Sequence, residues 1–255
     1  MTNLNYDGTF DGFLSAVFDI YEQRLGAVSI QPKLRSTETF FDETIEVMTE
    51  ERKAIRVWRG ISKKCSSRGR SNCYRAFLSE LPGIENKLLH FIRRSLAEKQ
   101  QIDQDFADPI ILDIAKTVKM VGREKHRMDA FIRFRRTKDD IYFATIAPDF
   151  NVLPLNIAHF KNRYADQKWL IYDLKRNYGA YYDLKTVEQV TLEVADKNAL
   201  ITTKLDVFTE DELAFQELWK NYFKSTNIPS RKNNKLHLQH VPKRYWRYLS
   251  EKSPI

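Results

Sequence analysis

The chain has 255 residues and a mass of 30.2 kDa, and 30% of its residues are charged and 42% hydrophobic. This composition argues against extensive disorder, no run of about twenty apolar residues could cross a membrane, and the first residues lack a signal-peptide pattern, so we expect a cytoplasmic protein. Lys and Arg outnumber Asp and Glu by 42 to 34, and the net charge of +8 favours acidic partners such as nucleic acid or an acidic protein surface.

The first region, residues 1–48, predicts a small β-α element. A short strand, a turn at Asp7-Gly8 and a helix follow one another, and a second strand is expected over residues 44–48. The helix should bury one apolar stripe, because its apolar residues recur three to four positions apart: Phe10, Phe13, Leu14, Val17, Phe18, Ile20 and Tyr21.

Residues 49–127 predict a helical region that begins with Thr49 as a cap. Breaks at 66–70, 81–83 and 105–109 divide it into four helices. Residues 128–208 then predict an antiparallel sheet, with hairpins over 128–148 and 169–183 separated by a helix from Pro154 to about Tyr164, and with VEQVTLEV as a further strand. Residues 209–255 predict a helix and a basic tail. The fold class is therefore α+β, with helices packed against hairpins in what could be one compact unit.

Strand alternation over the two hairpins divides their side chains between two faces. It places Trp169 and Ile171 in the core with Ala130, Ile132 and Phe134, and it places Phe131 and several Arg and Tyr residues on the opposite face. If that face is open, it can stack bases and neutralise phosphates; if helices cover it, the same residues are cross-strand pairs. The candidate nucleic-acid-binding residues, including two from flanking segments, are Arg133, Arg135, Arg163, Tyr172, Arg176, Tyr178, Tyr182 and Arg244. Exposed rings predict tighter binding to single-stranded than to duplex DNA.

Candidate acid–base residues lie near the predicted element junctions: His126, Asp149, His159 and Asp173. Each also has a structural interpretation, since Asp149 suits a turn and Asp173 can pair with Arg176. No metal site is predicted from HLQH at 237–240, and Cys65 and Cys73 are expected to be ordinary reduced thiols. No cofactor is predicted, because the chain lacks a three-cysteine cluster, a phosphate loop and a dinucleotide fingerprint.

Five stretches together resemble one bacterial family: YDGTFDGFLSAVFDIYE, RVWRG, YRAFLSELPGIE, HFKNRYADQKWLIYDLKRNYGAYYD and HVPKRYWRYL. This is a family of probable DNA metabolism proteins whose central region is a domain of unknown function. The resemblance implies a radical-SAM protein of DNA modification or repair encoded nearby. Some members are fused to a uracil-DNA glycosylase-like domain, and this chain is expected to be the short form without it.

Three hypotheses follow from the residues and the resemblance. The first is a DNA-binding accessory protein whose radical-SAM partner, with a separate glycosylase-like protein, performs the chemistry. The second is a DNA hydrolase, either a nuclease or a glycosylase-like enzyme, that uses the acid–base candidates. The third is a scaffold that contacts protein alone.

Overall fold

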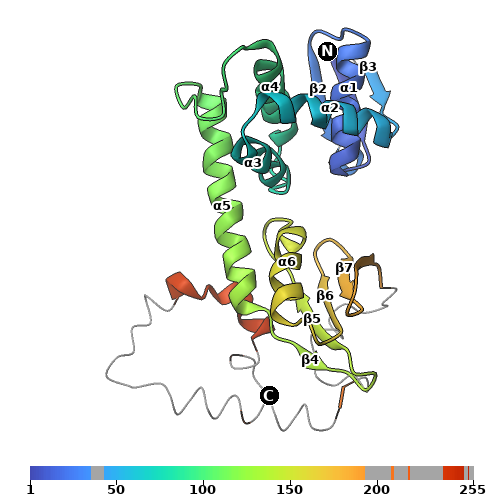
Figure 1. Ribbon diagram of the computed structural model, residues 1–255, viewed down its shortest axis with the longest axis vertical. Coiled ribbons are helices and arrows are strands. Elements are labelled where there is room, and N and C mark those ends of the chain that lie inside the picture. Colours follow the sequence, from blue (N-terminus) through green and yellow to red (C-terminus); the bar gives the residue numbers. More distant parts are fainter. Residues whose placement is uncertain (36–42, 193–207, 210–217, 219–237, 250–251, 253–255) are drawn as a thin grey trace. The chain divides into compact units, whose positions relative to one another are not determined.

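The computed structural model describes residues 1–35, 43–192, 208–209, 218, 238–249 and 252 (Figure 1). The chain forms two compact units, Met1–Gly122 and Arg123–Ile255. This division groups residues 1–48 with the predicted helical region, because α1 packs on α2. The helix expected from residue 209 and most of the basic segment after it, with His237, lie outside the described residues. In the described part, no helix is both long and apolar enough to cross a membrane.

The first unit begins with a small parallel sheet of order β2-β1-β3: β1 (Thr2–Tyr6), β2 (Val28–Pro32) and β3 (Glu43–Glu46). Helix α1 (Phe10–Glu22) follows β1 after the predicted turn, where Gly8 adopts a φ of +88°. Four residues of the predicted stripe are buried, but Tyr21 is 46% exposed, since it lies about 100° around the helix from buried Ile20. Strand β2 was not predicted from the sequence.

Four helices follow the first sheet, as the periodicity predicts. They are α2 (Glu51–Lys64), α3 (Ser67–Phe77), α4 (Ile84–Ala97) and α5 (Pro109–Phe131), with a short 3-10 turn η1 (Lys33–Arg35) before β3. The first unit ends within α5, at Gly122. The expected cap at Thr49 is wrong, because its hydroxyl donates to Asp7 Oδ2 at 2.8 Å and Glu50 occupies the cap position. The break near residue 66 is short, since Ser66 caps α3 through a hydrogen bond from the Gly69 N–H at 3.0 Å.

The second unit contains a five-stranded sheet of order β4-β5-β6-β7-β8. The strands are β4 (Arg135–Arg136), β5 (Tyr142–Ile146), β6 (Trp169–Asp173), β7 (Tyr178–Tyr182) and β8 (Val187–Val190). The turn of the first hairpin, the second hairpin, the helix α6 (Leu153–Arg163) and the first half of the final strand follow the prediction. The sheet is nevertheless mixed, because β5 and β6 are parallel and α6 makes the crossover between them.

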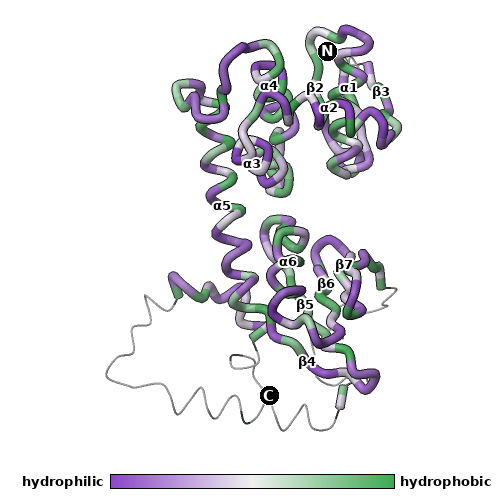
Figure 2. Tube along the Cα trace, viewed as in Figure 1, coloured by the Kyte–Doolittle hydropathy of each residue, from purple (hydrophilic) through white to green (hydrophobic). Residues whose placement is uncertain are grey.

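The predicted strand at 130–134 is wrong. Helix α5 continues to Phe131, and β4 is reduced to two residues. The reason is a helical period that overrides the local alternation, since Val121, Glu124 and Met128 are all buried at spacings of three and four. Figure 2 shows hydrophilic and hydrophobic residues intermixed along the whole of α5.

Both faces of the five-stranded sheet are covered. On one face, the α6 residue Phe160 lies 6.4 Å from Trp169, measured between ring centroids. On the other face, Phe143, Tyr172 and Leu174 pack with Phe208 and with Tyr248 of the 3-10 helix η3 (Lys243–Tyr248). Hence neither face is an open platform.

Candidate nucleic-acid interface

The predicted stacking rings are not on a common open surface. Tyr172 is opposite Gly179 and Tyr182 is opposite Trp169, so the two tyrosines occupy opposite faces of the sheet. They are only 2% and 3% exposed. The Tyr182 hydroxyl donates to the Leu184 carbonyl at 2.8 Å. The prediction of a shared exposed face is therefore wrong for these two residues, because the helical and C-terminal segments cover both sides.

Arg176 and Tyr178 hold the loop between β5 and α6. The Arg176 guanidinium pairs with Asp173 Oδ2 at 2.9 Å and donates to the carbonyls of Pro148 and Asp149, each at 3.2 Å. The Tyr178 hydroxyl donates to Asn151 Oδ1 at 2.5 Å. The Arg176 side chain is 9% exposed, so this guanidinium is a structural clamp with little surface for phosphate.

Arg244 belongs to a polar cluster around the buried carboxylate of Glu124. It contacts Glu124 Oε2 at 3.1 Å and Asp149 Oδ2 at 2.8 Å. Glu124 also accepts the Tyr245 hydroxyl at 2.5 Å and the Asp149 N–H at 2.9 Å. Burial, followed by the hydrogen bond to Glu124, raises the pKa of Tyr245, so the phenol remains the donor. The cluster fastens η3 to α5 and leaves Arg244 already paired with two carboxylates.

The remaining predicted arginines are dispersed. Arg133 donates to the Ala130 carbonyl at 2.7 Å, and the Arg135 guanidinium lies 4.2 Å from the centroid of the Phe208 ring. Arg163 is exposed near the end of α6, with its guanidinium 5.7 Å from the Tyr164 centroid. Of the eight predicted binding residues, Arg163 and Arg244 are the exposed ones.

Among the described residues, no hydrogen bond or ion pair joins the four acid–base candidates to one another. Asp173 is fully buried, and burial raises its pKa while Arg176 opposes that rise. His126 is exposed on α5, and His159 on α6 packs against the Phe160 ring at 5.0 Å. Within the described residues, neither imidazole forms a hydrogen bond or an ion pair.

A histidine–carboxylate pair does occur elsewhere, in the first unit. His90 Nε2 lies 2.8 Å from Asp108 Oδ2, and Arg94 contacts the same oxygen at 2.7 Å. The hydrogen bond with His90 and the contact with Arg94 lower the pKa of Asp108. The other oxygen of Asp108 accepts the Ile110 N–H at 2.7 Å, so Asp108 caps α5. This capping gives the Asp108 carboxylate a structural role. The Asp-Pro start of α5 signals this cap, whereas the partnership with His90 is tertiary.

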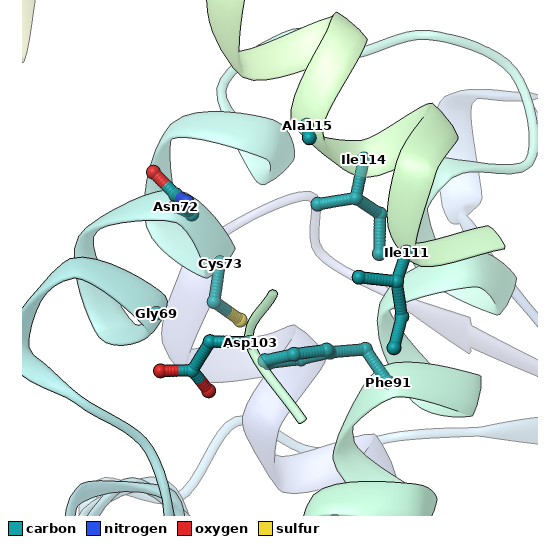
Figure 3. Close-up of a pocket in the computed structure, with 8 residues that line it drawn as sticks. All are labelled: Gly69, Asn72, Cys73, Phe91, Asp103, Ile111, Ile114 and Ala115. Carbon is teal, nitrogen blue, oxygen red and sulfur yellow. The ribbon is translucent and has the colours of Figure 1, made fainter. Parts of the chain in front are cut away.

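A small pocket in the first unit is lined by a carboxylate, a thiol and mostly apolar side chains (Figure 3). It is lined by Gly69, Asn72, Cys73, Phe91, Asp103, Ile111, Ile114 and Ala115. Both cysteines are free and buried, and burial raises the thiol pKa of Cys65 to about 11 and that of Cys73 to about 12. Such thiols are protonated and unreactive near neutral pH. Among the residues that the structure describes, no three His, Cys, Asp or Glu side chains are grouped to hold a metal ion.

The distribution of charge points to a different surface. Residues 51–77, which form α2 and α3, hold nine Lys or Arg and one Asp or Glu, a net charge of +8. Since the whole chain has 42 basic and 34 acidic residues, the other residues hold 33 of each and have no net charge. The basic balance of the protein is thus concentrated in two consecutive helices. Counting charge in successive windows would have found this signal in the sequence.

The chain belongs to the family described as a domain of unknown function, DUF4130, whose model matches residues 82–251. The match takes in α4, α5 and the five-stranded sheet, and it begins after the basic helices α2 and α3. A search of curated proteins gave no match.

Proposed function

We propose that this protein is a DNA-binding accessory component of a DNA repair or modification system. The observation that supports the proposal is the concentration of the entire net charge in residues 51–77. A local surplus of this size attracts a polyanion at long range, and phosphate neutralisation dominates the affinity of most DNA-binding proteins. The arginines of the hairpins are less suitable, because Arg176, for example, is 9% exposed and already contacts a carboxylate and two backbone carbonyls.

In this proposal a partner enzyme performs the chemistry. The resemblance of the sequence to probable DNA metabolism proteins names a radical-SAM protein as that partner and a uracil-DNA glycosylase-like protein as a second one. A cytoplasmic location is part of the same proposal. Of the candidate acid–base residues, Asp149 and Asp173 are already paired with arginines, and among the described residues His126 and His159 form no hydrogen bond or ion pair; this favours an accessory role over the alternative DNA hydrolase.

Fluorescence anisotropy with labelled single-stranded and duplex oligonucleotides tests the proposal. We expect binding at 50 mM salt that weakens steeply by 200 mM, because bound phosphates release counterions. No binding to either oligonucleotide at 50 mM salt would overturn the proposal and favour the protein-only scaffold. Incubation with damaged and undamaged oligonucleotides covers the hydrolase alternative, which would require product formation that substitution of His159 or Asp173 abolishes.

A further inference from the structure

We propose that the outer face of α2 is the surface that contacts the phosphate backbone of DNA. This cationic row consists of Arg52, Arg56, Arg59 and Lys63. The inference rests on the proposed function and deepens it, because it names the residues and the part of the DNA that meet. It also places the contact outside the region that the family model matches.

The spacing of the four residues aligns them along one side of the helix. Successive intervals of four, three and four residues keep side chains on a common face of an α-helix. From Arg52 to Lys63 the row extends roughly 16 Å at 1.5 Å per residue. A DNA strand has a phosphate about every 3.4 Å along the duplex axis, so the row is as long as about five nucleotides of one strand.

All four side chains are exposed, while the opposite side of α2 is buried at Ala54 and Ile61. Among the described residues, none of the four forms an ion pair with a carboxylate. The neighbouring cations of the helix differ in this respect. Lys53 pairs with Asp19 at 2.9 Å and with Glu50 at 2.7 Å, and Lys64 donates to the Glu98 carbonyl at 3.2 Å. The row is therefore an aligned set of exposed cations that carboxylates of the described residues leave available to an external anion, although the Arg56 guanidinium also lies 5.6 Å from the centroid of the Phe18 ring.

An ordinary solvated helix face does not explain this pattern. Such faces place acidic residues three or four positions from basic ones, because opposite charges at that spacing stabilise a helix and like charges destabilise it. Here Glu51 is the one acidic residue between residues 51 and 77. Arg52 lies in the first turn, where the helix dipole disfavours a cation. The local cost of gathering these charges is relieved by a bound polyanion.

The chemistry of the row indicates backbone contact without base stacking. Three of its four members are arginines, whose planar fork binds phosphate oxygens in pairs. The indole of Trp58 on the same helix packs edge-on against Phe10 at 5.4 Å, so it is engaged within the protein. With Tyr172 and Tyr182 buried as well, the earlier expectation of a single-strand preference loses its basis. We expect comparable affinity for single-stranded and duplex DNA and no dependence on base sequence.

The test compares two variants with the same change in net charge. The row variant carries Arg52→Gln, Arg56→Gln, Arg59→Gln and Lys63→Gln, and glutamine is a good helix former at exposed positions. The control variant carries Arg123→Gln, Arg163→Gln, Lys168→Gln and Lys185→Gln, four exposed cations of the second unit. Circular dichroism first verifies that both variants fold as the parent protein does. Anisotropy is then measured from 50 to 200 mM salt with both oligonucleotides.

For four phosphate contacts, the slope of log K against log salt is about −3.6 with duplex and about −2.8 with single strands, which corresponds to a loss of roughly 150-fold and 50-fold over this salt range. We expect the magnitude of this slope to fall by about 3 in the row variant, whereas the control variant should retain most of the parent protein's slope. Equal loss in both variants would overturn the assignment to α2 and leave the proposed function standing. Binding of an acidic protein such as poly-glutamate equal to that of DNA would overturn the assignment to phosphate.

Discussion

Disrupting the buried ion pair between Asp173 and Arg176 tests whether the Asp173 carboxylate has a structural role. We predict that Arg176→Met destabilises the protein by about 3–5 kcal/mol, because the substitution leaves the Asp173 carboxyl without its charge partner at a fully buried position. The Pro148 and Asp149 carbonyls also lose their donor. The loss is a large part of the 5–15 kcal/mol by which a typical domain is stable.

The measurement is urea denaturation followed by circular dichroism, combined with a double-mutant cycle. Asp173→Asn added to Arg176→Met should restore about 1–3 kcal/mol, since an uncharged amide still accepts the Lys175 N–H that Asp173 Oδ1 accepts at 2.9 Å. Lys168→Met is the control, because it removes a charge at an exposed site and should change stability by less than about 0.5 kcal/mol. A cost below about 1 kcal/mol for Arg176→Met, or strict additivity in the cycle, would refute the buried-pair reasoning.

The pH dependence of the same variant follows from the raised pKa of Asp173. Burial raises this pKa, and removal of the Arg176 guanidinium raises it further, so the folded variant holds a proton that the unfolded chain releases near pH 4. Its stability therefore falls as the pH rises through the folded pKa. Lowering the pH from 7 to 5 should narrow the difference between Arg176→Met and the parent protein, and a widening difference would contradict this account.

Three further predictions concern other buried polar groups. Asp108→Ala should cost about 1–3 kcal/mol at pH 7, because it removes the α5 cap, the hydrogen-bond partner of His90 and the charge partner of Arg94. Since the pKa of Asp108 is lowered, its contribution to stability is present above about pH 4 and is lost as the pH falls through the folded pKa, which acid titration of both proteins would reveal. Tyr245→Phe should cost about 1–3 kcal/mol in urea denaturation, because Glu124 loses a buried donor; an unchanged midpoint would contradict the role of the cluster. Cys65 and Cys73 should react with a thiol reagent at pH 7.5 only after denaturation, and fast labelling of the folded protein would contradict their burial.

Much of the architecture could be predicted because local signals and tertiary packing agree. The turn at Lys175–Asn177 illustrates this agreement, since Asn177 adopts the left-handed φ of +58° that asparagine tolerates. Prediction failed where a tertiary contact overrode the local pattern. The alternation at 130–134 has the period of a strand, yet α5 continues because Glu124 and Met128 face the core. The parallel pairing of β5 with β6 depends on the path of α6, which no local pattern specifies.

The candidate site was harder to predict than the fold, because the residue type of a cation does not tell whether the cation is available. In the second unit, acidic residues accompany the basic ones, and Arg176 and Arg244 are held by carboxylates that the fold brings to them. In α2 no acidic residue follows Glu51, so the exposed cations of this helix have no acidic neighbours further along it. The useful quantity is therefore the local balance between cations and carboxylates on one helix face. By this measure, a nucleic-acid surface is better sought on α2 than on the aromatic hairpins, although the hairpins hold the greater density of rings.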